Sequence, residues 1–332
     1  MRNKNVLVTG ANGFVGSALL EKLIEEGKCD KITALHRSEL SNEIRQRFGA
    51  SVQWLKADIT LSDLSTAVSN VDTIFHLAAY FSMSESQVEC DLMHHINVRG
   101  TTRLAKACKQ AGVSHFIYVS SIAACESGLV STINESNGFP TSAYGKSKKN
   151  AEEIVQRMAG NGFEVTVLRP TALFGENHLG SVYEIIKIIN KGWFLLIGNG
   201  MNHTNFYYIQ DFINILLAVK NDVRSYGQVF IAADNPHPLR DLIFGISLSL
   251  DKKCRILQVP LFLGYVIAIS YDVVTRLFGK PMPFSKRRYL AMTRDITYSN
   301  LKLSKTLNVS STYKVFEGLE RTIKWYQKMG YL

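Results

Sequence analysis

Short runs rich in β-branched residues alternate with helical patterns through the first half of this 332-residue chain. The runs at 5–9, 31–35, 52–55, 73–76, 115–119 and 164–168 predict strands, and apolar residues recur at helical spacing over 14–26, 61–68, 88–111 and 143–158. Parallel strands need a crossover connection, usually a helix, so the alternation indicates parallel pairing. We therefore predict an α/β fold, a Rossmann-type doubly wound parallel sheet with helices on both faces.

After Pro170 this alternation breaks up. Apolar and basic helical stretches follow, with one further predicted strand at 227–233. We expect a dinucleotide-binding Rossmann domain over 1–170 and a smaller α/β substrate-binding lobe over 171–332. The boundary is approximate because no Gly-, Ser- or Pro-rich linker marks it.

The composition, 46% hydrophobic and 20% charged, excludes a disordered or fibrous chain. The five cysteines are scattered without a Cys-x-x-Cys pair, so we expect reduced thiols, no metal site and a cytoplasmic location. The opening residues lack the long apolar segment of a signal peptide, and none is expected.

Positive charge is concentrated in the second half. Residues 1–170 carry 18 Lys and Arg against 17 Asp and Glu, whereas residues 171–332 carry 20 against 11. This favours an anionic partner, although a merely solvated basic face is an equal alternative. No nucleic-acid motif accompanies the charge, so nucleic acid is not expected as a partner. The apolar stretch 256–278 could touch a membrane peripherally, but we expect it to be a buried helix of the substrate lobe.

Three glycines follow the first predicted strand and open the first helix. They stand in the segment Gly10, Ala11, Asn12, Gly13, Phe14, Val15, Gly16. The first allows a tight turn, the second lets backbone N–H groups approach a pyrophosphate, and the third lets the helix pack closely on the strand. In this strand–turn–helix context the pattern predicts a dinucleotide site.

The end of the second strand bears on the choice of cofactor. An acidic residue there would bind the ribose hydroxyls of NAD, but this strand ends in His36 and Arg37. Arg37 could pair with a 2′-phosphate, so NADP is favoured over NAD. The alternative is a surface arginine that does not discriminate.

Two later strand ends complete the expected cofactor site. Asp58 and Ile59 follow the third strand, where a carboxylate could accept from the adenine amino group, although a turn or N-cap role is the alternative for Asp58. Small residues after the fourth strand would let the dinucleotide pass close by: Leu77, Ala78 and Ala79. We expect the preceding His76 to be packed in the core.

Tyr144 and Lys148 stand four residues apart and so share one helical face. A nearby ammonium, together with an oxidised nicotinamide, would lower the pKa of a phenol toward the range useful for acid/base catalysis. Ser120 and Ser121 follow the fifth strand, and we expect Ser121 to hydrogen-bond the same substrate oxygen as Tyr144.

In their order along nearly the whole chain, these motifs resemble the extended short-chain dehydrogenase/reductases, the NAD-dependent epimerase/dehydratase group. They are the glycine pattern, His76–Ala79, Asn97–Thr101, Val119–Ser121, Tyr144 with Lys148, and Leu168–Gly175. The resemblance implies that Tyr144 is the general acid/base, that Ser121 orients the substrate and that Lys148 tunes Tyr144 and binds ribose. It also implies cofactor contacts for Asn97, Ser120, Pro170 and Leu173, and a homodimer.

The resemblance leaves the substrate open. A nucleotide sugar is preferred, for a 4-epimerase or a 4-keto reductase, although Thr204 and Asn205 stand where such epimerases usually carry an arginine. Arg240 or a base in 252–288 could substitute. A dehydratase is disfavoured because one displaced acid, Glu126, stands where an Asp-Glu pair is typical. The alternatives are a reductase of a lipid, sterol-like or other small ketone, as in the 3β-hydroxysteroid dehydrogenase and dihydroflavonol reductase branches, and a non-catalytic NADP-binding protein.

Overall fold

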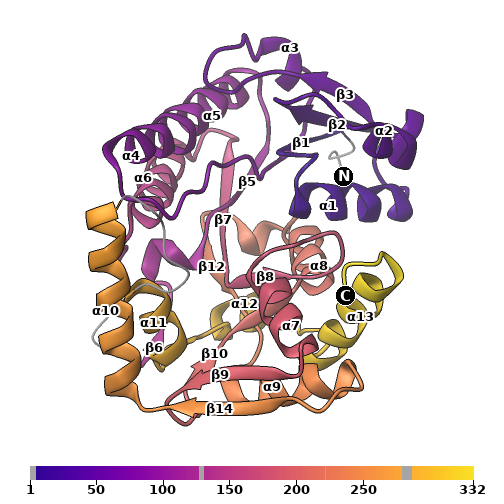
Figure 1. Ribbon diagram of the computed structural model, residues 1–332. Helices are drawn as coiled ribbons and strands as arrows, with labels where there is room; N and C mark the ends of the chain where they lie inside the picture. Colours follow the sequence, from indigo (N-terminus) through magenta and orange to yellow (C-terminus); the bar gives the residue numbers. More distant parts are fainter. Residues whose placement is uncertain (1–4, 127–130, 221, 279–285) are drawn as a thin grey trace.

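The computed structural model describes residues 5–126, 131–220, 222–278 and 286–332 (Figure 1). Its centre is a seven-stranded parallel sheet in the order β12-β7-β5-β4-β1-β2-β3. The strands are β1 (Asn5–Thr9), β2 (Lys31–His36), β3 (Gln53–Lys56), β4 (Thr73–His76), β5 (His115–Val119), β7 (Glu164–Pro170) and β12 (Val229–Ala232). The predicted α/β fold and all seven predicted strands are confirmed.

The helices of the first half cover both faces of this sheet (Figure 1). They are α1 (Phe14–Glu26), α2 (Asn42–Phe48), α3 (Ser65–Val68), α4 (Gln87–Met93), a π-helical turn η2 (His94–Gly100), α5 (Thr101–Gln110) and α6 (Ala143–Met158). The predicted helices 14–26 and 143–158 are confirmed. The helix predicted over 61–68 is wrong before Ser65, because the carboxylates of Asp58 and Asp63 accept backbone N–H groups and hold turns there instead.

The sheet reverses its strand order beside β1, which pairs with β2 on one side and β4 on the other. In an open parallel sheet such a reversal leaves a crevice at the carboxyl ends of the strands, where ligands bind. Thr9 ends β1 opposite Leu35 of β2 and His76 of β4. The glycine segment therefore begins inside this crevice.

The second half contributes both to this sheet and to a separate layer. Strand β12 extends the central sheet beside β7, with Val229 opposite Val167. The other strands form short pairs that the sequence patterns did not predict: β8 (Ala172–Phe174) with β11 (Phe206–Tyr208), β9 (Trp193–Ile197) with β14 (Arg255–Val259), β10 (His203–Thr204) with β13 (His237–Pro238), and β15 (Thr297–Tyr298) with β6 (Thr132–Ile133). The division at residue 170 stays a prediction.

The helices of the second half are α7 (Ser181–Asn190), α8 (Ile209–Val219), α9 (Leu239–Ser249), α10 (Leu261–Phe278), α11 (Lys286–Thr293), α12 (Leu301–Leu307) and α13 (Val315–Lys328). The apolar faces of α7, α8, α9, α12 and α13 join α1 and one face of the central sheet in a single cluster that includes Leu19, Phe212 and Leu319. The opposite sheet face packs on α5 and α6 through a second cluster that includes Leu104, Phe116 and Val155. The two halves therefore share a core.

Helix α10 does not lie in the core, so the expected burial of 256–278 is wrong. Small residues, Gly264 and Ala268, face the protein, and larger apolar residues such as Phe262 and Val266 are exposed. In Figure 1 α10 lies at the left margin of the molecule. Within the described residues, no helix has the length and apolar character needed to cross a membrane.

Candidate active site

The glycine segment closes tightly on β4. Gly10 has a φ of +64°, and a Cβ there would lie 2.9 Å from the backbone nitrogen of Ala78. A Cβ on Gly16 would lie 2.2 Å from the carbonyl oxygen of Gly10, so α1 packs directly on the turn. Only glycine fits these two positions, which leaves the N-terminus of α1 open to an anion.

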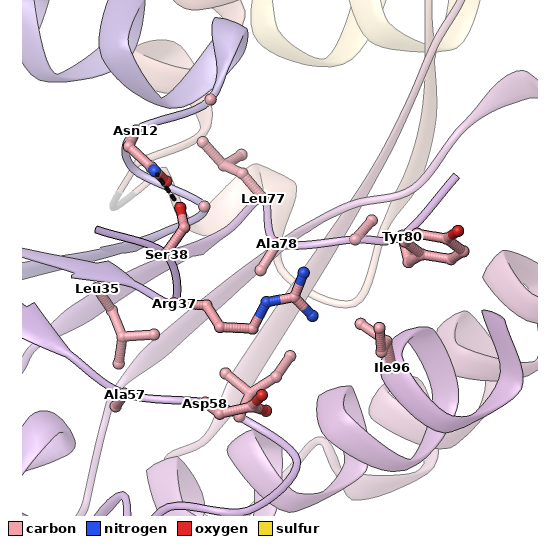
Figure 2. Close-up of a pocket in the computed structure, with 14 residues that line it drawn as sticks. Asn12, Leu35, Arg37, Ser38, Ala57, Asp58, Leu77, Ala78, Tyr80 and Ile96 are labelled. Atoms are coloured by element: carbon pink, nitrogen blue, oxygen red, sulfur yellow. Dashed lines mark hydrogen bonds between the residues drawn. The ribbon is translucent and has the colours of Figure 1, made fainter. Parts of the chain in front are cut away.

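A pocket of about 270 Å³ lies above the carboxyl ends of β1, β2, β3 and β4 (Figure 2). Nine of the predicted cofactor residues line it: Gly10, Asn12, Gly13, Arg37, Asp58, Ile59, Leu77, Ala78 and Ala79. Five further lining residues were missed: Leu35, Ser38, Ala57, Tyr80 and Ile96. All five are direct sequence neighbours of predicted residues, and Ile96, from η2, immediately precedes Asn97.

Arg37 reaches across this pocket. In Figure 2 its guanidinium lies between Asp58 and Ala78 and extends toward Tyr80. Asp58 is the one carboxylate among the described residues that line the pocket. Its Oδ1 accepts from the backbone nitrogen and the hydroxyl of Thr60 at 2.7 and 2.6 Å. Asp58 therefore holds a turn, as the alternative prediction had it, and also forms part of the pocket wall.

His36 does not line the pocket, so the structure does not support it as a cofactor contact. Its ring is buried edge-on against Trp54, and Nδ1 lies 2.8 Å from the carbonyl oxygen of Ser38. Because side chains alternate along a strand, His36 points to the opposite face from Arg37. Its hydrogen bond holds the turn that carries Arg37 and Ser38.

Several other predicted cofactor residues lie outside this wall: Phe14, Val15, Gly16, Asn97, Ser120, Tyr144, Lys148, Pro170 and Leu173. Phe14 stacks on His178 with ring centroids 4.2 Å apart. Asn97 is buried, and its amide donates to the carbonyl oxygen of Tyr80 and the hydroxyl of Ser147 while accepting from the Tyr80 nitrogen. Asn97 therefore ties the loop after β4 to α6.

The hydroxyl of Ser121 lies close enough to that of Tyr144 to lower the pKa of the phenol. Ser121 leaves β5 in an extended conformation and begins a short 3-10 turn over 122–125. Tyr144 lies in the first turn of α6, whose N-cap Ser142 accepts from the nitrogen of Gly145 at 3.1 Å. A Cβ on Gly145 would lie 2.2 Å from the carbonyl oxygen of Ala123, and this close approach brings the two hydroxyls together.

Lys148 lies one helical turn beyond Tyr144 and is only 1% exposed. Its Nζ donates to the carbonyl oxygen of Val119 at 2.8 Å and lies 4.3 Å from the ring centroid of Tyr118. Burial lowers the pKa of Lys148 to about 7, against the opposing effect of the Glu152 carboxylate. Glu152 is itself held by the buried Arg169 at 2.9 and 2.6 Å.

The lowering of the Tyr144 pKa by Lys148 together with an oxidised nicotinamide stays a prediction. By itself, burial raises the pKa of Tyr144 to about 12, and the neighbouring hydroxyl of Ser121 offsets this only in part. Desolvation disfavours the phenolate more than the surrounding groups favour it. The phenol is therefore neutral in the free protein.

Two buried hydroxyls beside this pair have no hydrogen-bond partner: Ser120 Oγ and Tyr118 Oη. Unpartnered buried polar groups are uncommon and indicate a missing ligand or water. Together with the glycine turn, they fit a dinucleotide whose polar end reaches β5.

His76, by contrast, is fully paired with the hydroxyls of Thr9 and Thr101 at 2.7 and 2.8 Å, and burial lowers its pKa to about 3. Its predicted core role is confirmed.

A second, larger pocket of about 900 Å³ lies next to the segments that carry Ser121 and Tyr144. Ile122 and Ser142 line it from the elements that carry Ser121 and Tyr144, Lys286 lines it from α11, and Arg294 lines it from the residue that follows α11. The ring of Phe81 lies edge-on to that of Tyr144, with the two centroids 4.9 Å apart. In sequence, Phe81 stands between Tyr80, which lines the first pocket, and Met83, which lines the second.

Sequence reasoning named Thr204 and Asn205 only as departures from an epimerase pattern, yet both line this second pocket. Asn205 is 5% exposed, and its Nδ2 donates to the carbonyl oxygen of Asp234 while Oδ1 has no partner. Arg240 does not line the pocket, whereas Lys286, within the basic stretch considered as a substitute, does.

A sequence model of the NAD dependent epimerase/dehydratase family matches residues 6–232, more than half of the chain. The chain belongs to this family. It is therefore an NAD(P)-dependent enzyme of the extended short-chain dehydrogenase/reductases, as its motifs predicted.

Curated relatives of this epimerase/dehydratase family member include an N-acetyl-alpha-D-glucosaminyl-diphospho-ditrans,octacis-undecaprenol 4-epimerase from Escherichia coli O157:H7. It is 28% identical over 97% of this chain and 95% of its own length. UDP-glucose 4-epimerase from Vibrio cholerae is 27% identical over 83% of each chain. The crystal structure of UDP-glucuronic acid 4-epimerase from Bacillus cereus in complex with NAD superposes with a TM-score of 0.78 at 19% identity, covering 98% of this chain and 96% of that one. At this identity the structural likeness concerns the fold.

Proposed function

We propose that the protein is a 4-epimerase of a sugar carried on a diphosphate, with a nucleotide sugar as the principal substrate class. The observation that carries this proposal is the close approach of the Ser121 and Tyr144 hydroxyls, on segments whose neighbouring residues Ile122 and Ser142 line the second pocket. The curated relatives support a sugar diphosphate as substrate and the 4-position as the site of reaction.

The second pocket suits such a substrate. Lys286 and Arg294 supply positive charge for a diphosphate, in place of the arginine that is absent near Thr204. The unpartnered Oδ1 of Asn205 can accept a hydrogen bond from a sugar or base N–H or O–H group. We infer that the diphosphate lies toward α11 and the sugar toward Tyr144.

Tyr144 is the group that moves the proton of the sugar hydroxyl. When bound, the dinucleotide exchanges hydride at its nicotinamide, and in the oxidised form its positive charge lowers the pKa of a neighbouring phenol. Tyr144 then takes the proton from the hydroxyl as the alcohol becomes a ketone, and returns it when the ketone is reduced. Ser121 holds the substrate oxygen in place through its own hydroxyl.

Lys148 acts as a positioning residue for Tyr144 and as a contact for the ribose. Its amine is already buried and bonded to Val119, so it offers further N–H donors without a large movement. The unpartnered hydroxyl of Ser120 lies on the same strand end. These two groups, with Pro170 and Leu173 from β7 and β8, form the proposed contacts of the nicotinamide half.

For the cofactor we propose NADP in preference to NAD. Arg37 extends into the first pocket, and no acidic residue occupies the end of β2 where a ribose-binding carboxylate would stand. Solved structural neighbours contain NAD, so the two dinucleotides must be compared directly.

The test is to offer UDP-glucose and UDP-N-acetylglucosamine to the purified protein and to follow the C4 configuration by NMR together with the absorbance of the reduced cofactor. Interconversion of the C4 epimers with no net change in cofactor oxidation state supports the epimerase. Stoichiometric consumption of NADPH with a ketone substrate would instead establish a reductase, the second candidate, which Arg37 favours. Cofactor binding without turnover of any sugar or ketone would leave a non-catalytic NADP-binding protein. The homodimer and the cytoplasmic location remain predictions.

A further inference from the structure

Helix α10 presents a continuous apolar stripe to the outside of the protein. Phe262, Val266, Ile269 and Val273 recur at spacings of four, three and four residues, which places them on one helical face. Phe262 is 71% and Val266 54% exposed. Isolated exposed apolar residues are ordinary, but a contiguous stripe of large ones marks an interaction surface.

The opposite face of α10 explains why this stripe points outward. A Cβ added to Gly264 would lie 2.7 Å from Cγ2 of Ile197 in β9, and Ala268 is completely buried. These small residues let the helix pack closely against the protein, so its large apolar residues have no room on that side. The orientation of α10 is therefore set by close packing.

Charge around the stripe distinguishes between possible occupants. By sequence the segment 252–288 is strongly basic with one acid, Asp272, and among its described bases Lys286 contacts a side chain of α10. Asp272 lines the second pocket, and its carboxylate accepts from the backbone nitrogen of Lys286 at 3.1 Å. The Nζ of Lys286 lies 5.9 Å from the ring of Tyr265, beside the stripe. Apolar residues bordered by lysine and tyrosine are typical of a helix that lies in the interface of an anionic membrane.

A second copy of the chain fits this surface less well. In a two-fold symmetric contact the same patch lies on both partners, so each copy would bring the positive charge of its Lys286 into the interface. Like charges brought together in this way oppose association. An anionic lipid surface complements the same charges.

The stripe is linked to the proposed active site through one helix pair. Helices α10 and α11 pack together, and the pocket wall includes Asp272 from the first, Lys286 from the second and Arg294 directly after it. A membrane against the outer face of α10 would therefore lie next to the pocket that we assign to the sugar diphosphate.

We propose that α10 docks on an anionic lipid surface and that the enzyme takes its substrate from that surface. In this substrate the diphosphate is esterified to the sugar at one end and to a lipid at the other. The docking part stands on the surface of α10 alone, whereas the substrate part rests on the proposed function. Beside the nucleotide sugars of the proposed function, this part adds a second substrate class, a polyprenyl-type diphosphate sugar, whose apolar chain stays in the membrane while its head group enters the pocket.

The docking test is cosedimentation of the full chain with phosphatidylcholine vesicles that contain about one-third phosphatidylglycerol. We expect the protein to bind these vesicles and the double variant F262E/V266E to bind at least about tenfold more weakly. The matched control is F244E/L248E on α9, where Phe244 and Leu248 are 62% and 64% exposed and also four residues apart. NADP binding by each variant confirms its folding.

Three results would overturn the docking proposal. In the first, the unaltered protein stays in the supernatant. In the second, both double variants lose vesicle binding equally. In the third, light scattering shows that F262E/V266E converts a dimer to a monomer, which would make a second copy the occupant of the stripe.

The substrate part is tested by turnover of two substrates: N-acetylglucosamine linked through diphosphate to a prenyl chain in the same vesicles, and water-soluble UDP-N-acetylglucosamine. We expect F262E/V266E to lower turnover of the vesicle-borne sugar at least about tenfold and to leave any turnover of the UDP-sugar unchanged. Equal turnover of the vesicle-borne sugar by the variant would refute this part. Failure to convert either sugar would refute the proposed function, and the sedimentation result would still decide the docking.

Discussion

Gly145 lies against the carbonyl oxygen of Ala123, which an added Cβ would meet at 2.2 Å. The contact joins the first turn of α6, which carries Tyr144, to the turn that follows Ser121. Neither residue has a chemical role of its own. Their close approach nevertheless determines whether the two hydroxyls of the proposed catalytic pair can meet.

We therefore expect Gly145→Ala to lower both stability and activity. Because the obstacle is backbone, the first turn of α6 must move away, at a cost of about 1–3 kcal/mol in the free energy of unfolding. Turnover should fall more than the melting temperature suggests, since the Ser121–Tyr144 distance increases. Thermal unfolding and kcat measure the two effects. Lys146→Ala, an exposed neighbour on the same turn, is the control, and a fully active Gly145→Ala enzyme would contradict the interpretation.

Tyr144→Phe should remove turnover and leave cofactor binding intact. The substitution deletes the hydroxyl that moves the proton, and general acid/base groups contribute about 10²–10⁴-fold to rate. The measurements are kcat on the sugar substrate and the Kd of NADP by fluorescence titration. Tyr183→Phe removes a hydroxyl that bonds the carbonyl oxygen of Tyr331, and it should keep full activity. Normal turnover by Tyr144→Phe would show that another group moves the proton.

Lys148 should make stability depend on pH in the alkaline range. Its pKa falls from the ordinary value of 10.5 to about 7 in the folded protein because of burial. Between these values the unfolded chain binds the proton and the folded protein does not, so stability rises with pH across this window, by at most about 1.4 kcal/mol per pH unit. Below pH 7 both states are protonated, and the unfavourable contribution of the buried ammonium is fully present.

The measurement is the melting temperature of the unaltered protein and of Lys148→Met from pH 7 to pH 10. The unaltered protein should gain stability relative to the variant as the pH rises. Lys149→Met, at a side chain that is 32% exposed, is the control and should show no such relative gain. A difference between the unaltered protein and Lys148→Met that stays constant with pH would mean that the buried amine keeps an ordinary pKa.

Arg37→Ala should change the choice between dinucleotides. If Arg37 pairs with the 2′-phosphate, its removal weakens NADP binding by about 1.5–3 kcal/mol, roughly 10–100-fold, and leaves NAD binding nearly unchanged. Calorimetric Kd values for both dinucleotides test this. Arg45→Ala, on α2 and outside the pocket wall, serves as the matched loss of one positive charge. An equal loss of affinity for NAD and NADP would mean that Arg37 contacts a part common to both.

Much of the nucleotide half was predictable from local patterns. The bounds of β1, α1, β4, β5 and α6 agree with the periodicity of their apolar residues, and the three glycines indicated the turn before α1. Nine residues of the first pocket followed from their positions at strand ends. These features depend on side chains within a few residues of one another, and the period of the pattern records them directly.

Other features depend on residues far apart in the chain, so no local pattern contains them. Strand β12 reaches the central sheet by pairing with β7, some sixty residues earlier, and α10 became a surface helix because Gly264 fits against Ile197. The spacing of Tyr144 and Lys148 put them on one helical face, but the protein packed around each group sets its charge: burial raises the pKa of the phenol and lowers that of the amine. Helical spacing arises from hydrogen bonds between near neighbours, whereas desolvation depends on every element that packs around a group.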